Sequence, residues 1–305
     1  MKASRRYEIF DVFTSDVLAG NPLAIVHDAD DLDEVAMQAI AREFNLSETV
    51  FVRQSEKPGH SAAIRIFTPH YELPFAGHPT VGTAVALAYR RFPVVDSEAE
   101  ALIVLEEKIG TVRCGVRLSP VSAFAEFDLP RLPDHLGVEI EKRDVATALG
   151  LSPHEVGFEN HTPSVWSAGN PYLMVPVHDL AAAAKIEINA GFAEKALPSV
   201  GTRRMPVYAY CRESVYHDSA FHARMFVISG GYEDPATGSA VAAFAGTMAH
   251  FDEPLDGLHP FWIEQGIEMG RPSRIRLEIE IADLKIAAAR IGGAAVKVAE
   301  GTLFT

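Results

Sequence analysis

The stretch that decides the fold occurs twice, reading GHPTVGTAVA at residues 77–86 and TGSAVAAFAG at residues 237–246. Both copies are rich in small apolar residues and leave little polar face, which is typical of a helix enclosed by a sheet. We align Gly82-Thr83-Ala84-Val85-Ala86 with Gly238-Ser239-Ala240-Val241-Ala242, an offset of 238 − 82 = 156. The sequence therefore predicts two equivalent enclosed helices.

Two further motifs recur in the same order. Gly20-Asn21-Pro22 reappears as Gly169-Asn170-Pro171, at 169 − 20 = 149, and Arg65-Ile66-Phe67 reappears as Arg224-Met225-Phe226, at 224 − 65 = 159. Three ordered motifs at nearly constant spacing are most simply explained by two copies of one αβ lobe.

Short strands and a few helices fill the sequence between these motifs. The expected helices are Leu32 to Phe44, Pro79 to about Arg91, Lys142 to Leu149 and Gly238 to His250. The expected strands are Tyr7 to Phe13, Leu23 to His27, Thr49 to Arg53, Ser61 to Phe67, Leu102 to Leu105, Thr111 to Val116, Ala123 to Phe127, segments near Ser164, Tyr172, Pro206 and His222, and a tail of Ile275 to Ile281, Lys285 to Ile291 and Ala295 to Ala299. Asp31 with Glu34 is interpreted as the start signal of the first helix.

The stretch that contains Pro130, Pro133 and Gly137 interrupts this pattern and is interpreted as the linker between the lobes. We expect an N-terminal lobe at residues 1–128, which the C-terminal strand 295–305 could complete, and a second lobe at residues 129–294.

Composition excludes several classes of protein. With 305 residues, 48% apolar, the chain is long enough for about two domains with a large core. Asp and Glu exceed Lys and Arg by 41 − 27 = 14, so we expect neither nucleic acid nor a membrane surface as a partner. Cys114 and Cys211 lie far apart and suggest no disulfide framework, and with no signal-peptide pattern this favours a soluble, cytoplasmic protein.

Common catalytic motifs are absent from the sequence. It contains no G-x-G-x-x-G, Walker loop, G-x-S-x-G or H-E-x-x-H pattern, which argues against the common nucleotide, hydrolase and zinc-protease chemistries. The 12 histidines are scattered, and no pair has a helical spacing typical of metal ligands. We therefore expect no metal.

Each enclosed helix follows a loop that contains Pro and Gly, and the free backbone N–H groups of such helix starts favour an anion. If the lobes are related by a pseudo-twofold axis, the two helix starts can face one cleft and take a small carboxylate. The plainer interpretation is that His78 and Asp234 only cap helices, with Pro79 and Pro235 at or near the first helical position.

Glu48 is the leading candidate for chemistry. It lies between Asn45-Leu46-Ser47 and the apolar strand that begins at Thr49, where an inward carboxyl would have its pKa raised by burial toward the range of a general acid or base. From the pattern alone, the plainer interpretation is favoured, namely a side chain that faces solvent at a strand end.

Six motifs together resemble the phenazine-biosynthesis PhzF-like family. They are Gly20-Asn21-Pro22, Asn45-Leu46-Ser47-Glu48-Thr49, Arg65-Ile66-Phe67-Thr68-Pro69, Glu72-Leu73-Pro74-Phe75-Ala76-Gly77-His78-Pro79-Thr80, Glu233-Asp234-Pro235-Ala236-Thr237-Gly238-Ser239-Ala240, and Gln265-Gly266 through Gly270-Arg271-Pro272-Ser273. The resemblance covers nearly the whole chain. It implies the α+β diaminopimelate-epimerase fold, in which two pseudo-symmetric lobes each wrap a mostly antiparallel sheet around a central helix, with the active cleft between them.

The resemblance also implies roles for individual residues. Glu48 matches the carboxylate that carries the proton, and His78, Asp234 and Ser239 match polar residues that position the substrate and relay protons. Gly77 and Gly238 match points where backbone N–H groups approach the substrate.

The activity implied is that of an isomerase without cofactor or metal, resembling trans-2,3-dihydro-3-hydroxyanthranilate isomerase, that acts on a small cyclic amino-carboxylate as a homodimer. Two alternatives stay open. One is an amino-acid epimerase or racemase on the same fold, which the absence of cysteines from the helix starts disfavours. The other is a small-molecule-binding protein without turnover.

Overall fold

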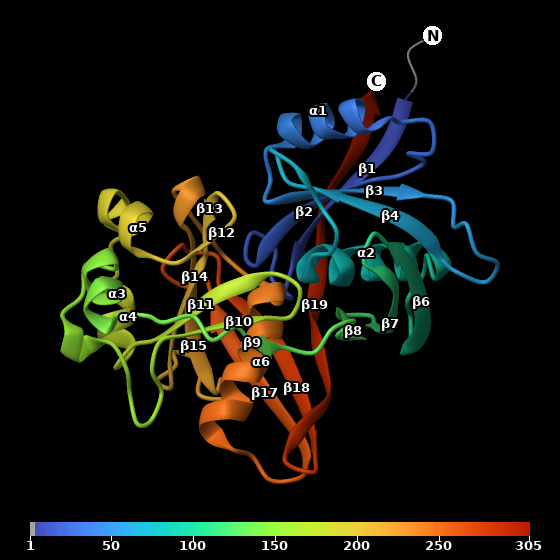
Figure 1. The fold of residues 1–305 in the computed structure, drawn as a ribbon. Coiled ribbons are helices and arrows are strands. Elements are labelled where there is room, and N and C mark those ends of the chain that lie inside the picture. Colours follow the sequence, from blue (N-terminus) through green and yellow to red (C-terminus); the bar gives the residue numbers. More distant parts are fainter. Residues whose placement is uncertain (1–3) are drawn as a thin grey trace. The chain divides into compact units, whose positions relative to one another are not determined.

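A computed structural model describes residues 4–305 of the chain, and these residues form two units (Figure 1). Unit 1 contains the described residues up to Pro130 together with Gly292–Thr305, and unit 2 is Arg131–Ile291. Each unit combines mostly antiparallel strands with helices, so the predicted α+β class is confirmed.

Unit 1 carries two helices among its described residues, α1 (Glu34–Phe44) and α2 (Gly77–Arg91). Its strands are β1 (Ser4–Val12), β2 (Asn21–Val26), β3 (Glu48–Arg53), β4 (Ala62–Phe67), β5 (Glu72–Leu73), β6 (Ala99–Glu107), β7 (Gly110–Ser119) and β8 (Ser122–Asp128). Strand β19 (Lys285–Phe304) begins in unit 2, and its last part, from Ala295 to Phe304, pairs antiparallel with β1 in unit 1.

Unit 2 is built from the intervening segment. Its helices are α3 (Lys142–Ala148), α4 (Leu180–Lys185), α5 (Ala190–Ala196) and α6 (Gly238–Asp252), with 3-10 turns at Pro153–Glu155 and Ile228–Gly230. Its strands are β9 (Asp134–His135), β10 (Ser164–Ser167), β11 (Pro171–Pro176), β12 (Ser199–Val200), β13 (Arg203–Arg204), β14 (Val207–Cys211), β15 (Phe221–Val227), β16 (Tyr232–Asp234), β17 (Gly257–Gln265) and β18 (Ser273–Ala282).

The two units repeat one topology. In unit 1 the strand order β1-β2-β3-β4-β6-β7 alternates antiparallel and parallel pairs, starting and ending with an antiparallel pair. Unit 2 has the same alternation in the order β10-β11-β14-β15-β17-β18. The two-residue strand β5 pairs with β4 as the short β16 pairs with β15, and each is followed by the long helix of its unit. The predicted duplication of an αβ lobe is therefore present in the strand pairing itself.

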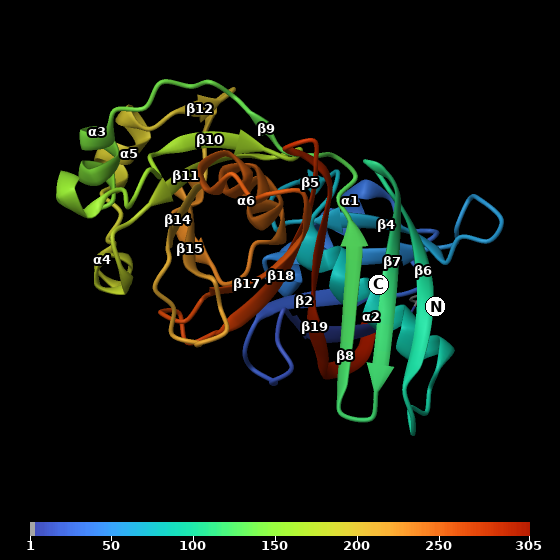
Figure 2. The same cartoon turned by 90° about the horizontal axis from the view of Figure 1, so that it is seen from below.

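The two long helices are enclosed by the sheets because their residues are nearly all small or apolar. Helix α2 packs against β1, β2, β3, β6, β7 and β8, and most of its residues are buried. Helix α6 is surrounded by the strands of unit 2 (Figure 2). Phe244 of α6 lies among the rings of Tyr208, Tyr210 and Phe221, at centroid distances of 5.7, 4.6 and 5.1 Å. Burial of this aromatic cluster contributes several kcal/mol by the usual transfer arithmetic, roughly 1.5–3 for each large side chain.

Three sequence-based expectations are wrong in detail. Helix α1 is capped by Asp33, whose carboxylate accepts from Ala36 N at 2.8 Å, and not by Asp31, which pairs with Arg5 at 2.7 Å. The tail expected as separate strands from Lys285 is one continuous strand, because Gly292 and Gly293 remain extended and paired within it.

The third error is the register of the helix alignment. Helices α2 and α6 begin at Gly77 and Gly238, an offset of 238 − 77 = 161, so Gly82 lies in the interior of α2. Helices made mostly of Ala, Gly and Val resemble one another at many registers, and the offset of 156 is one of the coincidental ones.

Candidate active site

Glu48 and His78 come together in unit 1. Glu48 is the first residue of β3, and Asn45, in the left-handed conformation at φ 51°, ends helix α1 and turns the chain into this strand. The Oε2 atom of Glu48 lies 3.3 Å from Nε2 of His78, and only 16% of the Glu48 side chain is exposed. Glu48 therefore does not face solvent, which removes the plainer interpretation of its pattern.

His78 is the second residue of α2 and is buried. Burial lowers the pKa of its imidazole from 6.5 to about 3, so the ring is neutral at physiological pH. The N-cap of α2 is Ala76, and no side chain caps this helix, so His78 does not act as a cap. The N–H groups of the first turn, which have no acceptor within a helix, are those of Gly77 and His78, since Pro79 has none.

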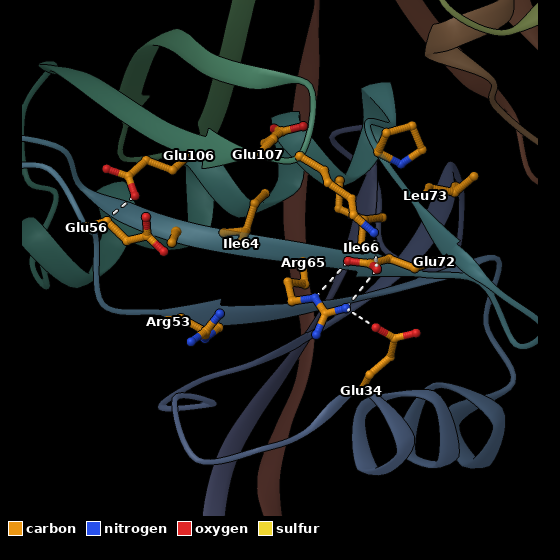
Figure 3. A pocket seen from close by; sticks show the side chains of 13 residues that line it. Glu34, Arg53, Glu56, Ile64, Arg65, Ile66, Glu72, Leu73, Glu106 and Glu107 are labelled. Atoms are coloured by element: carbon orange, nitrogen blue, oxygen red, sulfur yellow. Dashed lines mark hydrogen bonds and ion pairs between the residues drawn. The ribbon is translucent and has the colours of Figure 1, made fainter.

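The segment that leads into helix α2, from Glu72 to Gly77, is fixed at its start by a bidentate ion pair. Arg65 on β4 donates from Nε and Nη2 to the two carboxylate oxygens of Glu72 on β5, both at 2.7 Å, and also contacts Glu34 at 2.9 Å. Lys108 adds a further bond to Glu72 at 2.7 Å. Figure 3 shows this pair inside a pocket of about 420 Å³.

Four charged side chains of that pocket, Glu34, Arg65, Glu72 and Lys108, are engaged with one another, and none of the candidate site residues of unit 1 lines it. We therefore assign the pocket's ion pair to holding β5, and with it the start of α2.

Asp234 is placed by a hydrogen-bonded loop in unit 2. Its carboxylate Oδ2 accepts from the hydroxyl of Thr237, and its carbonyl accepts from Nε2 of Gln265 at 2.7 Å. Gln265 also accepts from the backbone N–H of Thr237 at 3.2 Å, and Ser273 donates to the carbonyl of Pro235 at 3.0 Å. Asp234 ends strand β16 and Thr237 is the N-cap, so Asp234 lies outside helix α6.

Ser239 is the second residue of α6, the position that His78 has in α2. Its Oγ lies 2.6 Å from the phenol oxygen of Tyr172 on β11, a side chain that is buried. Gly238 is the first residue of α6 and is buried. The free N–H groups of this first turn are thus flanked by a hydroxyl pair, as those of α2 are flanked by an imidazole.

The two clusters are equivalent parts of the repeat. Both follow the pattern Glu-x-Pro-x-x-Gly, from Glu72 to Gly77 and from Glu233 to Gly238. Glu233 receives two bonds of 2.8 Å from Arg224 on β15, as Glu72 does from Arg65. The contact of Tyr172 with Ser239 and the bonds by which Gln265 holds the loop were not predicted from the sequence, although Tyr172 follows one of the repeated motifs and Gln265 lies within another motif.

Neither cysteine belongs to these clusters. Cys114 lies on β7 and Cys211 on β14, and both thiols are buried. Burial raises the pKa of both, to about 12 for Cys211, so neither is a thiolate near neutral pH. Residues 4–305 contain no group of three or more His, Cys, Asp or Glu side chains arranged to hold a metal ion.

None of the helices formed by the described residues 4–305 has both the length and the apolar character needed to cross a membrane. A family model described as "Phenazine biosynthesis-like protein" matches residues 10–301. The chain belongs to the PhzF-like family. The resemblance seen in the motifs is confirmed.

Several curated relatives of this PhzF-like chain are named isomerases. An uncharacterized isomerase of Mesorhizobium japonicum is 56% identical over 99% of both chains. The trans-2,3-dihydro-3-hydroxyanthranilate isomerase of Pseudomonas aeruginosa is 32% identical over 98% of this chain and 99% of its own. The predicted enzyme class is confirmed: the chain is an isomerase of this family.

Solved structures agree with the fold. A PhzF-family phenazine biosynthesis protein of Bacillus anthracis superposes with a TM-score of 0.87 at 27% identity, covering 99% of this chain and 100% of that one. A hydroxyproline epimerase of Agrobacterium vitis, 13% identical, has a TM-score of 0.65 over 100% of this chain and 94% of that one, and shows the shared fold alone.

Proposed function

We propose that this PhzF-like isomerase moves a proton between two carbons of a small, cyclic, amino-substituted carboxylate, with Glu48 as general acid and base. The observation that carries the proposal is the contact of 3.3 Å between the Glu48 carboxylate and an imidazole that burial keeps neutral. An imidazolium at this place would pair with Glu48 and weaken it as a base, whereas neutral His78 leaves the carboxylate its basicity.

In the proposed reaction one proton leaves the substrate and one proton returns to it. Glu48 takes a proton from one carbon, and the electron pair of the broken C–H bond enters the π system of the substrate. The same carboxyl then returns the proton to a second carbon, and a double bond changes place. Because the oxidation state of the substrate as a whole does not change, the step needs no oxidant or reductant, and we propose that it proceeds without cofactor or metal.

Substrate binding is assigned to the two first helical turns. The N–H groups of Gly77 and Gly238 lie at helix starts, where the helix dipole favours a carboxylate. Asp234 and Ser239 position the amino and hydroxyl groups of the substrate, and with His78 they relay protons.

The substrate named for the relatives, trans-2,3-dihydro-3-hydroxyanthranilate, is the first to test. Proton NMR in D₂O would follow the isomerisation of this substrate and the uptake of deuterium into the product, with wild type, Glu48→Gln and Glu43→Gln compared as enzymes. Glu43 is an exposed carboxylate of the same unit and serves as the matched control. We expect turnover to fall by at least about 100-fold in Glu48→Gln and to stay unchanged in Glu43→Gln.

Equal turnover in wild type and Glu48→Gln would refute the role of Glu48. Turnover of a different cyclic amino-carboxylate, lost in Glu48→Gln, would keep the reaction and replace the substrate.

A two-thiol racemase is disfavoured by chemistry, since both cysteines are buried with raised pKa values and lie on strands outside the helix starts. Exchange of the Cα proton of free amino acids in D₂O tests this alternative. From the composition and the family we further propose a cytoplasmic homodimer, which sedimentation equilibrium would test.

A further inference from the structure

Glu107 is a buried carboxyl that the proposed reaction does not use. It is the last residue of β6, where the inward face carries Ala101, Ile103 and Leu105 before it, and it is 8% exposed. Its neighbour Glu106 points to the other face and accepts from the backbone N–H of Glu56 at 2.8 Å (Figure 3). A carboxyl in this row of apolar side chains needs a partner inside the unit.

That partner is the first turn of α2. Oε1 of Glu107 lies 2.8 Å from Oγ1 of Thr80, and the same Oγ1 lies 2.8 Å from the carbonyl oxygen of Ala76. A hydroxyl has one proton, and a carbonyl has none to give. Two separate hydrogen bonds at these distances therefore require a proton on Glu107, which donates to Thr80 while Thr80 donates to Ala76.

The surroundings of Glu107 agree with a neutral acid. Its second oxygen, Oε2, is buried and has no hydrogen-bond partner among residues 4–305, which would be costly for a carboxylate. Burial raises the pKa of Glu107 to about 8 even with a Thr80 hydroxyl that donates to the carboxylate, an arrangement that lowers the pKa. The titratable group that interacts with it from β7 is the thiol of Cys114, and the inward residues of β8 are Ala123, Ala125 and Phe127, which carry no charge.

The protonation of Glu107 affects the start of helix α2. Ala76 is the N-cap of α2, and no side chain caps the helix there. The carbonyl of Ala76 instead accepts from the Thr80 hydroxyl at 2.8 Å and from the Thr80 backbone N–H at 3.2 Å. A negative charge on Glu107 would break the proton chain and oppose a second anion at the same helix end. A neutral Glu107 keeps the N–H groups of Gly77 and His78 for the carboxylate of the substrate.

We propose that Glu107 is a positioning residue, a neutral carboxylic acid that donates to Thr80 and so holds the first turn of α2 in the form that binds the substrate carboxylate. The protonation of Glu107 is a property of the free enzyme. Only its role in binding the substrate carboxylate rests on the proposed function.

The protonation is tested without substrate. Infrared difference spectra of wild type, Glu107→Gln and the outward-facing control Glu106→Gln are recorded between pH 6 and pH 10. We expect the carbonyl stretch of a protonated carboxylic acid in wild type and Glu106→Gln, lost as the pH rises through about 8, and absent at every pH in Glu107→Gln. A wild-type spectrum without this band at pH 6 would overturn the proposal, whatever the enzyme turns over.

The positioning role is tested with the pH profile of kcat/KM on trans-2,3-dihydro-3-hydroxyanthranilate. The amide of Glu107→Gln can donate to Thr80, so we expect its kcat/KM to be within about twofold of wild type at pH 7. Wild type should lose kcat/KM as Glu107 ionises near pH 8, whereas the amide of the variant does not ionise and should show no such loss. Glu107→Leu and Thr80→Val remove the donor or the relay and should lower kcat/KM about tenfold or more.

A Gln variant with the same high-pH loss as wild type, or a Thr80→Val variant with unchanged kcat/KM, would overturn the positioning role. If wild type does not turn over this substrate, the proposed function fails there, while the infrared result still decides the state of Glu107.

Discussion

His222 should make unit 2 less stable as the pH rises above neutrality. This is the opposite of a carboxylate with a lowered pKa, whose contribution to stability is lost as the pH falls. The imidazole is 1% exposed, and its two nitrogens lie 2.8 Å from Glu264 Oε1 and 2.9 Å from Glu268 Oε1. With a carboxylate at each nitrogen, the ring is held as imidazolium. Burial acts to lower the pKa of His222, but the hydrogen bonds and charges of Glu264 and Glu268 raise it to about 9.

The magnitude follows from linkage. The pKa is about 9 in the folded unit and 6.5 in the unfolded chain, and one pH unit corresponds to about 1.4 kcal/mol, so the protonated ring contributes about 3 kcal/mol. Because the folded pKa is the higher one, this contribution is fully present below pH 6.5 and is lost as the pH rises through about 9. For a urea slope of about 2 kcal/mol per M, the unfolding midpoint would shift by roughly 1.5 M.

The assay is urea unfolding between pH 6 and pH 10, followed by tryptophan fluorescence. The chain has 2 tryptophans, Trp166 and Trp262, and both belong to unit 2, so the signal reports this unit. Wild type is compared with His222→Gln and with His154→Gln, an exposed histidine of the same unit. We expect the free-energy gap between wild type and His222→Gln to narrow by about 3 kcal/mol from pH 6.5 to pH 10. A gap that is constant with pH would refute the reasoning, and His154→Gln should follow wild type throughout.

Three further outcomes are expected. Gly82→Val should lower the free energy of unfolding by about 1–3 kcal/mol in thermal melts, since a Cβ at Gly82 would lie 2.7 Å from a leucine side chain of β2, whereas Gly115→Ala, with open space around it, should not. Phe244→Ala should cost about 3–5 kcal/mol, because the ring is fully buried among three aromatic rings; a loss under about 1 kcal/mol in urea unfolding would contradict this. Cys114 and Cys211 should react slowly with a thiol reagent in native protein at pH 7 and quickly in urea, and rapid native labelling of either would speak against their burial.

Much of the fold was predictable because its signals are local. Helix α1 shows its apolar period, and Asn45 ends it in the left-handed conformation that asparagine tolerates. The N-cap was not predictable, since Asp31 and Asp33 are equally suited by type. Arg5, on a distant strand, engages Asp31 and leaves Asp33 to the helix.

Repeats were visible in the sequence, but the register of the two long helices was not. The Glu-x-Pro-x-x-Gly pattern that relates Glu72 to Glu233 has only three fixed residues. The runs of Ala and Val in α2 and α6 match over more consecutive residues, and they led to the wrong alignment of the two helices. The structure reveals it because Arg65 and Arg224 bind these two glutamates in the same way.

By itself the sequence determined the α+β class, the duplication and the family, and through the family resemblance it singled out Glu48 as a candidate, because these depend on composition, local periodicity and motifs of contiguous residues. Only the tertiary structure decided that Glu48 meets a neutral His78, 30 positions away, that Ser239 pairs with Tyr172, and that the carboxyl of Glu107 lies against the hydroxyl of Thr80. The physical reason is that pairing, burial and pKa depend on which strands enclose each helix start, and no single segment of the chain carries that information.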